Sequence, residues 1–211
     1  MEYNLAGIRQ RILVDKLDDD EFDPQIVDNF LNDAQRDIFN QFELPFQEKI
    51  FQGTIPAGST MFQLPSDVAQ VQSRTVAGVP GFNGMKMQWR DFFRSYPDAD
   101  NETPGAPSLW TQYAGNILLS TPTDQDYTMT LFYIRKPKIL VENGDVPEIP
   151  EEFSELLILG AFKRILERNE DFDLANEVEA DYQRILLQLV NRYGARDADG
   201  PIIMKNMQRR G

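Results

Sequence analysis

Apolar side chains recur every three or four positions near both ends of the chain, the spacing that places them on one face of a helix. Near the N-terminus this pattern predicts helices over residues 4–17 and 24–44. Asp23 has the side chain of a good N-cap for the second helix, and Pro24 suits its first turn. Because Pro45 cannot continue that helix, we expect the helix to end just before it.

Near the C-terminus the same spacing predicts helices over residues 151–168 and 173–193, with Asp171 or Asp173 as the cap of the last one. Each pair of helices carries an apolar stripe that it cannot bury alone. The simplest arrangement packs the N-terminal pair against the C-terminal pair, so we expect the four helices to form one bundle.

From residue 46 to 140, short apolar alternations are separated by Pro, Gly and Asn, a pattern typical of strands joined by turns. We expect the turn at residues 56–59 to join the two strands beside it as a hairpin. A second hairpin is expected at the turn that contains Gly115 and Asn116. Six short antiparallel strands are typical of a small sandwich or barrel. The predicted strands are residues 49–55, 60–64, 70–77, 109–113, 117–120 and 127–134.

Four aromatic residues stand at positions i, i+3, i+4 and i+7, which predicts a short helix over residues 89–96 that covers the sheet. Packing in the core is the first interpretation of these side chains, because aromatic residues dominate protein cores. A stacking platform for bases or sugars is the alternative. The four residues are Trp89, Phe92, Phe93 and Tyr96.

Together these patterns predict an α+β fold, in which a small antiparallel β-sandwich or barrel is inserted into a helical bundle. We expect four segments along the chain. They are N-terminal helices at residues 1–45, a β insertion at 46–140, C-terminal helices at 141–194 and an extended tail at 195–211.

The residue types that are missing exclude several classes of function. The chain has no Cys and no His, so it has no disulfide, thiolate nucleophile, Ser-His-Asp triad or His-ligated zinc. The acidic run Asp18–Asp23 lacks the Gly and the final Glu of an EF-hand loop, which favours a solvated turn between helices. We therefore expect no catalytic residues, no metal and no cofactor.

Charge and hydropathy narrow the choice of partners. The chain has 34 acidic and 21 basic residues, a net charge of −13. Proteins that grip nucleic acid by its phosphates need clustered Lys and Arg, so we expect DNA to pass this surface without specific binding. No stretch approaches the ~20 apolar residues of a membrane span, and the N-terminus lacks the order of a signal peptide. We expect no membrane contact and a place in the cytoplasm, or in a particle assembled there.

Residues 195–211 combine apolar and basic side chains without strong periodicity. A frayed terminus is one interpretation, because chain ends are commonly poorly ordered. A docking peptide is the other, because apolar side chains at a free end are unfavourable until a partner covers them. The candidate docking residues are Ile202, Ile203, Met204, Met207, Arg209 and Arg210.

Six segments, taken in their order along the chain, resemble a known protein family. They are residues 30–38, the hairpin 53–67, Gly105–Pro107, the strand and turn 115–122, residues 133–137 and residues 149–153. Their order and spacing, from about residue 5 to residue 193, resemble the head-to-tail connector (adaptor) proteins of tailed phages. The chain is also similar to the tail tubular (gatekeeper) proteins of short-tailed phages.

The resemblance implies a structural virion protein and not an enzyme. It implies a ring of about twelve copies at the head-tail junction, built on a closed heterologous contact. The portal protein would bind one side, with the C-terminal tail reaching into it, and a stopper, nozzle or tail tube protein would bind the other. The helical bundle would line a channel for double-stranded DNA, and the β insertion would stand outward or toward the tail.

Two other functions remain open at this stage. A carbohydrate-binding or sugar-cleaving module would use the Trp and Tyr residues of the β insertion. A regulator that mimics DNA through its negative charge would need acidic residues in two regular rows. The acidic composition by itself also suits a DNA conduit, because repulsion at close range keeps a duplex moving.

Overall fold

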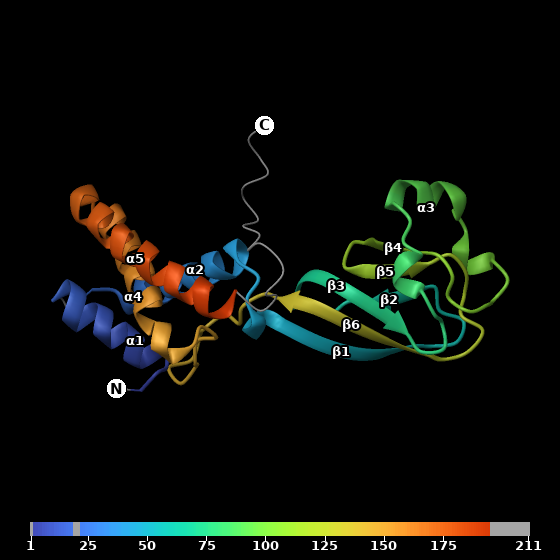
Figure 1. Cartoon of the computed structure of the whole chain (residues 1–211), viewed down its shortest axis with the longest axis horizontal. Helices are drawn as coiled ribbons and strands as arrows, with labels where there is room; N and C mark the ends of the chain where they lie inside the picture. Colours follow the sequence, from blue (N-terminus) through green and yellow to red (C-terminus); the bar gives the residue numbers. More distant parts are fainter. Residues whose placement is uncertain (1, 19–21, 195–211) are drawn as a thin grey trace. The chain divides into compact units, whose positions relative to one another are not determined.

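A computed structural model describes residues 2–18 and 22–194. The chain divides into two compact units. Of the described residues, one unit holds those up to Gln47 together with those from Lys136 to Gly194, and the other is Glu48–Arg135. The first is helical, and the second consists mainly of strands with the short helix α3 (Trp89–Ser95) beside them (Figure 1). The predicted α+β class, with a β unit inserted between helices, is confirmed.

The helical unit contains every helix that the sequence predicts at the two ends of the chain. Asp23 accepts a hydrogen bond from the backbone N–H of Gln25 and caps the helix that Pro24 opens, while Asp171 caps the last helix through Leu174 N. Phe42 has extended backbone angles, so the second helix ends before the predicted position. The elements are α1 (Leu5–Arg11), the π-helical η1 (Ile12–Leu17), α2 (Pro24–Gln41), η2 (Pro45–Gln47), η5 (Glu151–Phe153), α4 (Ser154–Arg168) and α5 (Phe172–Tyr193).

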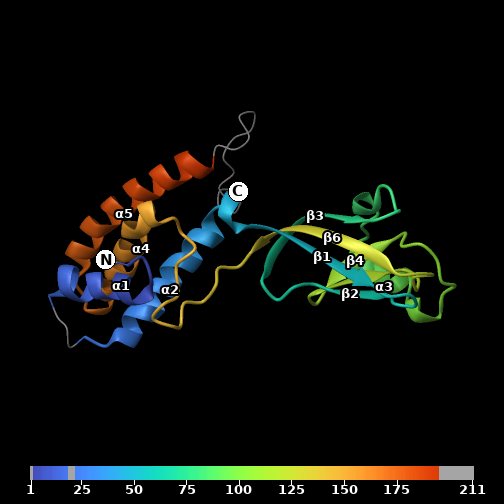
Figure 2. The same ribbon diagram turned by 90° about the horizontal axis from the view of Figure 1, so that it is seen from below.

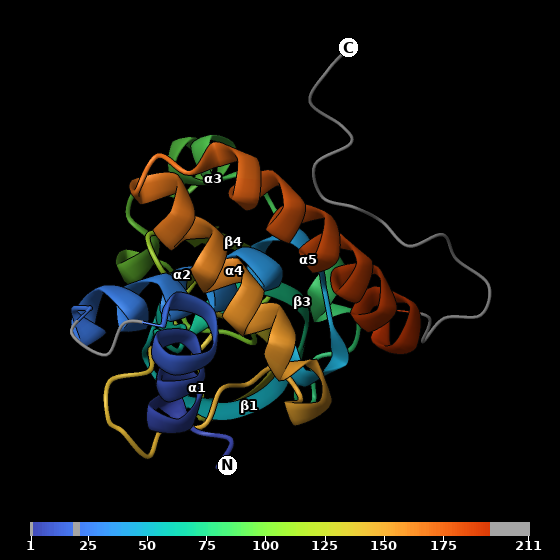
Figure 3. The same cartoon turned by 90° about the vertical axis from the view of Figure 1, so that its left-hand side faces the viewer.

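Helix α4 is the centre of this unit and packs against α1, α2 and α5 (Figure 3). Its residues Leu156, Leu157 and Ile165 are fully buried. Gly160 marks the closest approach to α2, since a Cβ built on it would lie 2.9 Å from the Cβ of Ala34. Leu140 is buried in the same core, although it falls within the range 46–140 expected for the insertion.

The β unit consists of two three-stranded antiparallel sheets with strand orders β1-β6-β3 and β2-β5-β4. Figure 2 shows β1 and β6 running side by side. The two sheets share one hydrophobic core and stay open, with no closed barrel in the part of the chain that the structure describes. The elements are β1 (Glu48–Ile55), β2 (Met61–Gln63), β3 (Val68–Val76), η3 (Phe82–Gly84), α3 (Trp89–Ser95), η4 (Ala99–Asn101), β4 (Trp110–Tyr113), β5 (Asn116–Leu119) and β6 (Tyr127–Arg135).

One predicted hairpin is confirmed and the other is wrong. Strands β4 and β5 pair across a turn in which Ala114 and Gly115 both have positive φ, the requirement of a tight hairpin turn. The strands beside the turn at residues 56–59 do not pair with each other, since β1 pairs with β6 and β2 pairs with β5. Thr123 donates to Pro56 O at 2.6 Å and holds this turn, which carries the chain from one sheet to the other.

The aromatic residues of the predicted short helix do not all enter the core. Phe92 is buried, but Trp89 and Phe93 are 42% and 41% exposed. Both contact the exposed ring of Tyr113, with ring centroids 5.3 and 5.5 Å apart. The expectation of core packing is therefore wrong for Trp89 and Phe93, because a helix of two turns presents only one narrow face to the sheet.

Candidate functional site

The loop between Lys136 and helix α4 is irregular in structure and is anchored by side chains of α2. Two amide side chains on one face of α2 bind its backbone. Asn32 accepts from Leu140 N at 2.7 Å and donates to Leu140 O at 2.9 Å. Gln35, which is buried, donates to Lys138 O at 3.0 Å and accepts from Glu148 N at 2.9 Å. The two amides thus satisfy backbone N–H and C=O groups of the loop that would bond to a neighbouring strand if the loop were part of a sheet.

Asp145 closes the loop from within. One of its carboxylate oxygens accepts from the backbone N–H groups of Val141 and Glu142 at 2.8 and 2.9 Å, and the other pairs with Lys138 Nζ. Hydrogen bonding, first from Lys138 and then from the two backbone groups, lowers the pKa of Asp145 to about 2. The loop therefore keeps this carboxylate ionised at any ordinary pH.

The loop also caps the first helix. The first backbone donors of a helix have no partner within it. Here Leu5 N donates to Asp145 O at 2.8 Å and Ala6 N donates to Asn143 O at 3.1 Å. Because the loop supplies these acceptors, the position of α1 and the conformation of the loop depend on each other.

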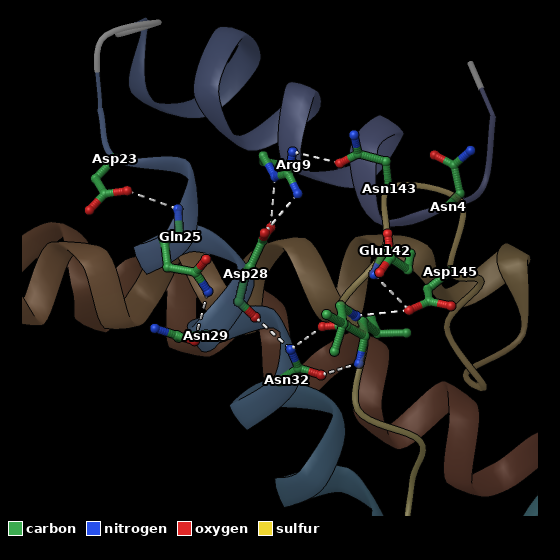
Figure 4. A network of polar contacts seen from close by, with 12 residues as sticks. Asn4, Arg9, Asp23, Gln25, Asp28, Asn29, Asn32, Glu142, Asn143 and Asp145 are labelled. Atoms are coloured by element: carbon green, nitrogen blue, oxygen red, sulfur yellow. Dashed lines mark hydrogen bonds and ion pairs between the residues drawn. The ribbon is translucent and has the colours of Figure 1, made fainter.

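A part-buried ion pair joins α1, α2 and the loop into one network (Figure 4). Arg9 donates from Nε and Nη2 to the two carboxylate oxygens of Asp28, both at 2.7 Å. Its third nitrogen, Nη1, donates to Asn143 Oδ1 at 3.1 Å. Bidentate guanidinium–carboxylate pairs of this kind fix orientation as well as distance, so the loop is held in one geometry.

Three of the loop's apolar side chains face solvent although its backbone is fixed. Ile139, Val141 and Val146 are 70%, 69% and 56% exposed, and together we call them the apolar loop surface. Ile139 and Val141 flank Leu140, whose side chain is buried in the helical core. Exposed apolar groups on a segment that is already ordered are typical of contact surfaces, because little conformational freedom is lost when a partner covers them.

The arrangement suits binding better than acid–base chemistry. The carboxylates of Asp28 and Asp145 already accept hydrogen bonds from cationic and backbone donors. Within residues 2–18 and 22–194, no group of Asp and Glu residues is arranged to hold a metal ion. In the same residues, every helix is too short or too polar to span a bilayer.

The structure does not test the docking site that the sequence suggested. The candidate docking residues Ile202, Ile203, Met204, Met207, Arg209 and Arg210 fall outside the described residues. The sequence predicts residues 142–145 only as a loop. Its one local signal was the presence of Ile139, Val141 and Val146 in a polar segment, which a solvated loop does not need.

Comparison with known proteins gives one result. The model of the family described as SU10 adaptor protein matches residues 3–205, nearly the whole chain. No curated protein matches the chain. The match agrees with the resemblance to phage adaptors and gives no support to the similarity with gatekeeper proteins. Since the match covers all of the β unit and nearly all of the helical unit, the chain belongs to the SU10 adaptor protein family of bacteriophage structural proteins.

Proposed function

We propose that copies of this chain form the adaptor ring between the portal and the tail of a phage particle, with about twelve copies in a closed heterologous ring. The portal protein binds one side of the ring, and a stopper, nozzle or tail tube protein binds the other. Double-stranded DNA passes through the ring during packaging and ejection. The ring is added during assembly in the host cytoplasm and remains at the head-tail junction of the virion.

The observation that carries this proposal is the apolar loop surface on a chain of an adaptor family. In a heterologous ring, every copy offers one surface that the next copy covers with a different one. We assign Ile139, Val141 and Val146 to this contact between neighbouring copies. Their fixed backbone favours association, because ordering a mobile loop on binding would cost conformational entropy.

The acidic composition supports the conduit role. A net charge of −13 repels phosphate groups over the Debye length of about 8 Å at physiological salt. DNA in such a channel meets no surface that holds it in place. The C-terminal residues 202–210 remain our proposal for the segment that docks into the portal, because their apolar and basic side chains differ in character from the rest of the chain.

The test is to mix the chain with portal protein from the same source and to image the complexes by negative-stain electron microscopy. A ring of density coaxial with the portal is expected, and a chain that never associates with the portal would overturn the proposal. Truncation at residue 195 is expected to abolish attachment and to leave the circular dichroism spectrum of the free chain unchanged. A truncated chain that unfolds would contradict the docking role of the tail.

The loop assignment has its own variants. Ile139→Asp combined with Val141→Asp is expected to leave the fold intact and to prevent closed rings, because charges replace the covered apolar groups. Met61→Asp is the matched control, since Met61 is 51% exposed but lies in the β unit. If the double variant still forms closed rings, the proposed loop contact is refuted, but the proposed adaptor function is not.

A carbohydrate-binding module is the alternative, and one observation favours it. The exposed rings of Trp89 and Tyr113 lie 5.3 Å apart, beside a depression of about 430 Å³ lined by Lys86, Met87, Gln88, Trp89, Thr111 and Gln112. A glycan-binding screen of the wild type and of Trp89→Ala distinguishes the two functions. The adaptor proposal predicts that both proteins give blank screens.

A further inference from the structure

Arg74 is a buried cation in the core of the β unit. It lies on β3 two residues before Val76, so both side chains face the core between the two sheets. Arg74 is 6% exposed and is the one buried basic residue in the part of the chain that the structure describes. Its guanidinium carbon stands 3.8 Å from the ring centroid of Trp110, which is fully buried and donates from Nε1 to Phe82 O at 2.8 Å.

This guanidinium has no counter-charge among the described residues. Its Nε and Nη1 atoms are covered and make no hydrogen bond. Other arginines of the chain are paired with carboxylates, as Arg9 is with Asp28 and Arg192 is with Glu152. Burial lowers the pKa of Arg74 to about 10, so the side chain is still charged at neutral pH. Apart from the Trp110 ring, this buried charge has no partner among the described residues. A buried charge without an opposite charge is unfavourable, which points to a group that arrives from outside.

A hollow of about 300 Å³ lies beside Arg74. Its wall is the turn after β3, in which Gly78 and Gly81 both have positive φ, a conformation that other residues adopt only with strain. Arg74 is the only charged residue among those that line it. The lining residues are Arg74, Thr75, Val76, Gly78, Val79, Pro80, Gly81, Phe82 and Asn83.

We propose that this hollow binds a carboxylate, which pairs with the guanidinium of Arg74. One cation in an apolar hollow matches one negative charge, whereas a doubly charged phosphate would need further donors. The carboxylate belongs either to a small free acid or to an Asp or Glu side chain of a second copy, of which each chain carries 34. The second source rests on the proposed ring, whereas the first is independent of it.

A purely protective role for Arg74 makes a different prediction. Strand β3 is an edge of its sheet, and inward-facing charges are one way in which proteins keep sheet edges from pairing with other chains. Such a role needs no ligand. It predicts that removing the charge promotes aggregation and that carboxylates have no specific effect.

The fluorescence of Trp110 reports on the hollow directly. The chain has two tryptophans, so the variant Trp89→Phe leaves Trp110 as the only strong emitter. In one arm, this variant is titrated with sodium acetate, and separately with inorganic phosphate, against sodium chloride at equal ionic strength. In the other arm, its concentration is raised without acetate while emission and sedimentation are measured together.

A saturable shift of Trp110 emission with acetate, and none with phosphate, would identify a free acid as the ligand. A shift that appears only as the chain self-associates would identify a carboxylate of a second copy. Either shift must disappear in Trp89→Phe combined with Arg74→Met, and must be weakened but present with Arg74→Lys. Circular dichroism checks that the variants are folded. If neither arm gives a shift, or if Arg74→Met leaves it unchanged, the carboxylate site is refuted.

Discussion

Asn32 on α2 binds both backbone groups of Leu140, accepting from its N–H at 2.7 Å and donating to its C=O at 2.9 Å. The two residues are 108 positions apart in the chain. This contact fixes the loop before α4 in the helical unit, while the side chain of Leu140 is buried in the core. Asn32 therefore anchors the loop at Leu140, between the exposed side chains of Ile139 and Val141, and Gln35 anchors it at Lys138 and Glu148.

Asn32→Ala is expected to destabilise the chain by about 1–3 kcal/mol, because it leaves a part-buried N–H and C=O without partners. Urea denaturation followed by circular dichroism measures this loss. Asn29→Ala is the control on the same helix, since Asn29 is exposed and makes only a 3.4 Å contact with Gln25. We call the contacts of Asn32 and Gln35 with the loop backbone the amide clamp. Equal losses in the two variants would mean that the Asn32 part of this clamp adds nothing to the free energy of unfolding.

Arg9→Met is expected to cost about 3 kcal/mol, because it leaves the buried carboxylate of Asp28 without its cation. The double variant Arg9→Met with Asp28→Leu is expected to recover most of this loss, since neither charge then remains buried. The free energies of unfolding of the wild type, both single variants and the double variant form a complete cycle. A double variant as unstable as Arg9→Met alone would contradict this account.

Asp145 gives the stability a defined dependence on pH. Its pKa is about 2 in the folded chain and 3.8 as an ordinary value, so the folded state binds fewer protons between these values. Its stabilisation is complete above about pH 4 and is lost as the pH falls through about 2. The urea midpoints of the wild type and Asp145→Asn are expected to differ most above pH 4 and to converge toward pH 2. Glu142→Gln serves as the control, because only the backbone N–H of Glu142 bonds Asp145.

Gly160→Ala is expected to be destabilising although alanine favours helices by about 1 kcal/mol. The new Cβ would lie 2.9 Å from Ala34 Cβ and 3.2 Å from Tyr182 Cε2, and relieving this overlap costs about 1–3 kcal/mol. Gly144→Ala is the matched control, because a Cβ at this position would meet nothing within 4 Å. Thermal unfolding of the two variants is expected to separate them clearly.

Local patterns were enough to predict most elements. Asp23 and Pro24 identified the start of α2, and the alternation of residues 127–134 identified β6. The hairpin error at residues 56–59 has a physical reason, since a turn signal fixes where the chain bends but not which strand it will pair with. That choice depends on long-range register, such as Gly53 opposite Met129.

The anchored loop before α4 could not be predicted from the sequence either, because it too depends on long-range contacts. The amides of Asn32 and Gln35 are unremarkable on a helix, and their partners lie more than a hundred residues away. The isolated guanidinium of Arg74 was equally hidden, because nothing in the sequence of β3 separates an inward arginine from an outward one. The exposure of Trp89 and Phe93 depended on how much of a short helix the sheet covers.

The contacts of Asn32 and Gln35 with the loop backbone affect which substitutions the loop can accept. Asn32 and Gln35 grip main-chain atoms of the loop, which every amino acid possesses. The exposed side chains at positions 139, 141 and 146 contribute nothing to that grip. They can be exchanged for others without disturbing the scaffold, so in the proposed ring the choice of neighbour and the stability of the fold are set at separate positions. If the proposed contact holds, substitution at these three sites fits the chain to a new neighbour.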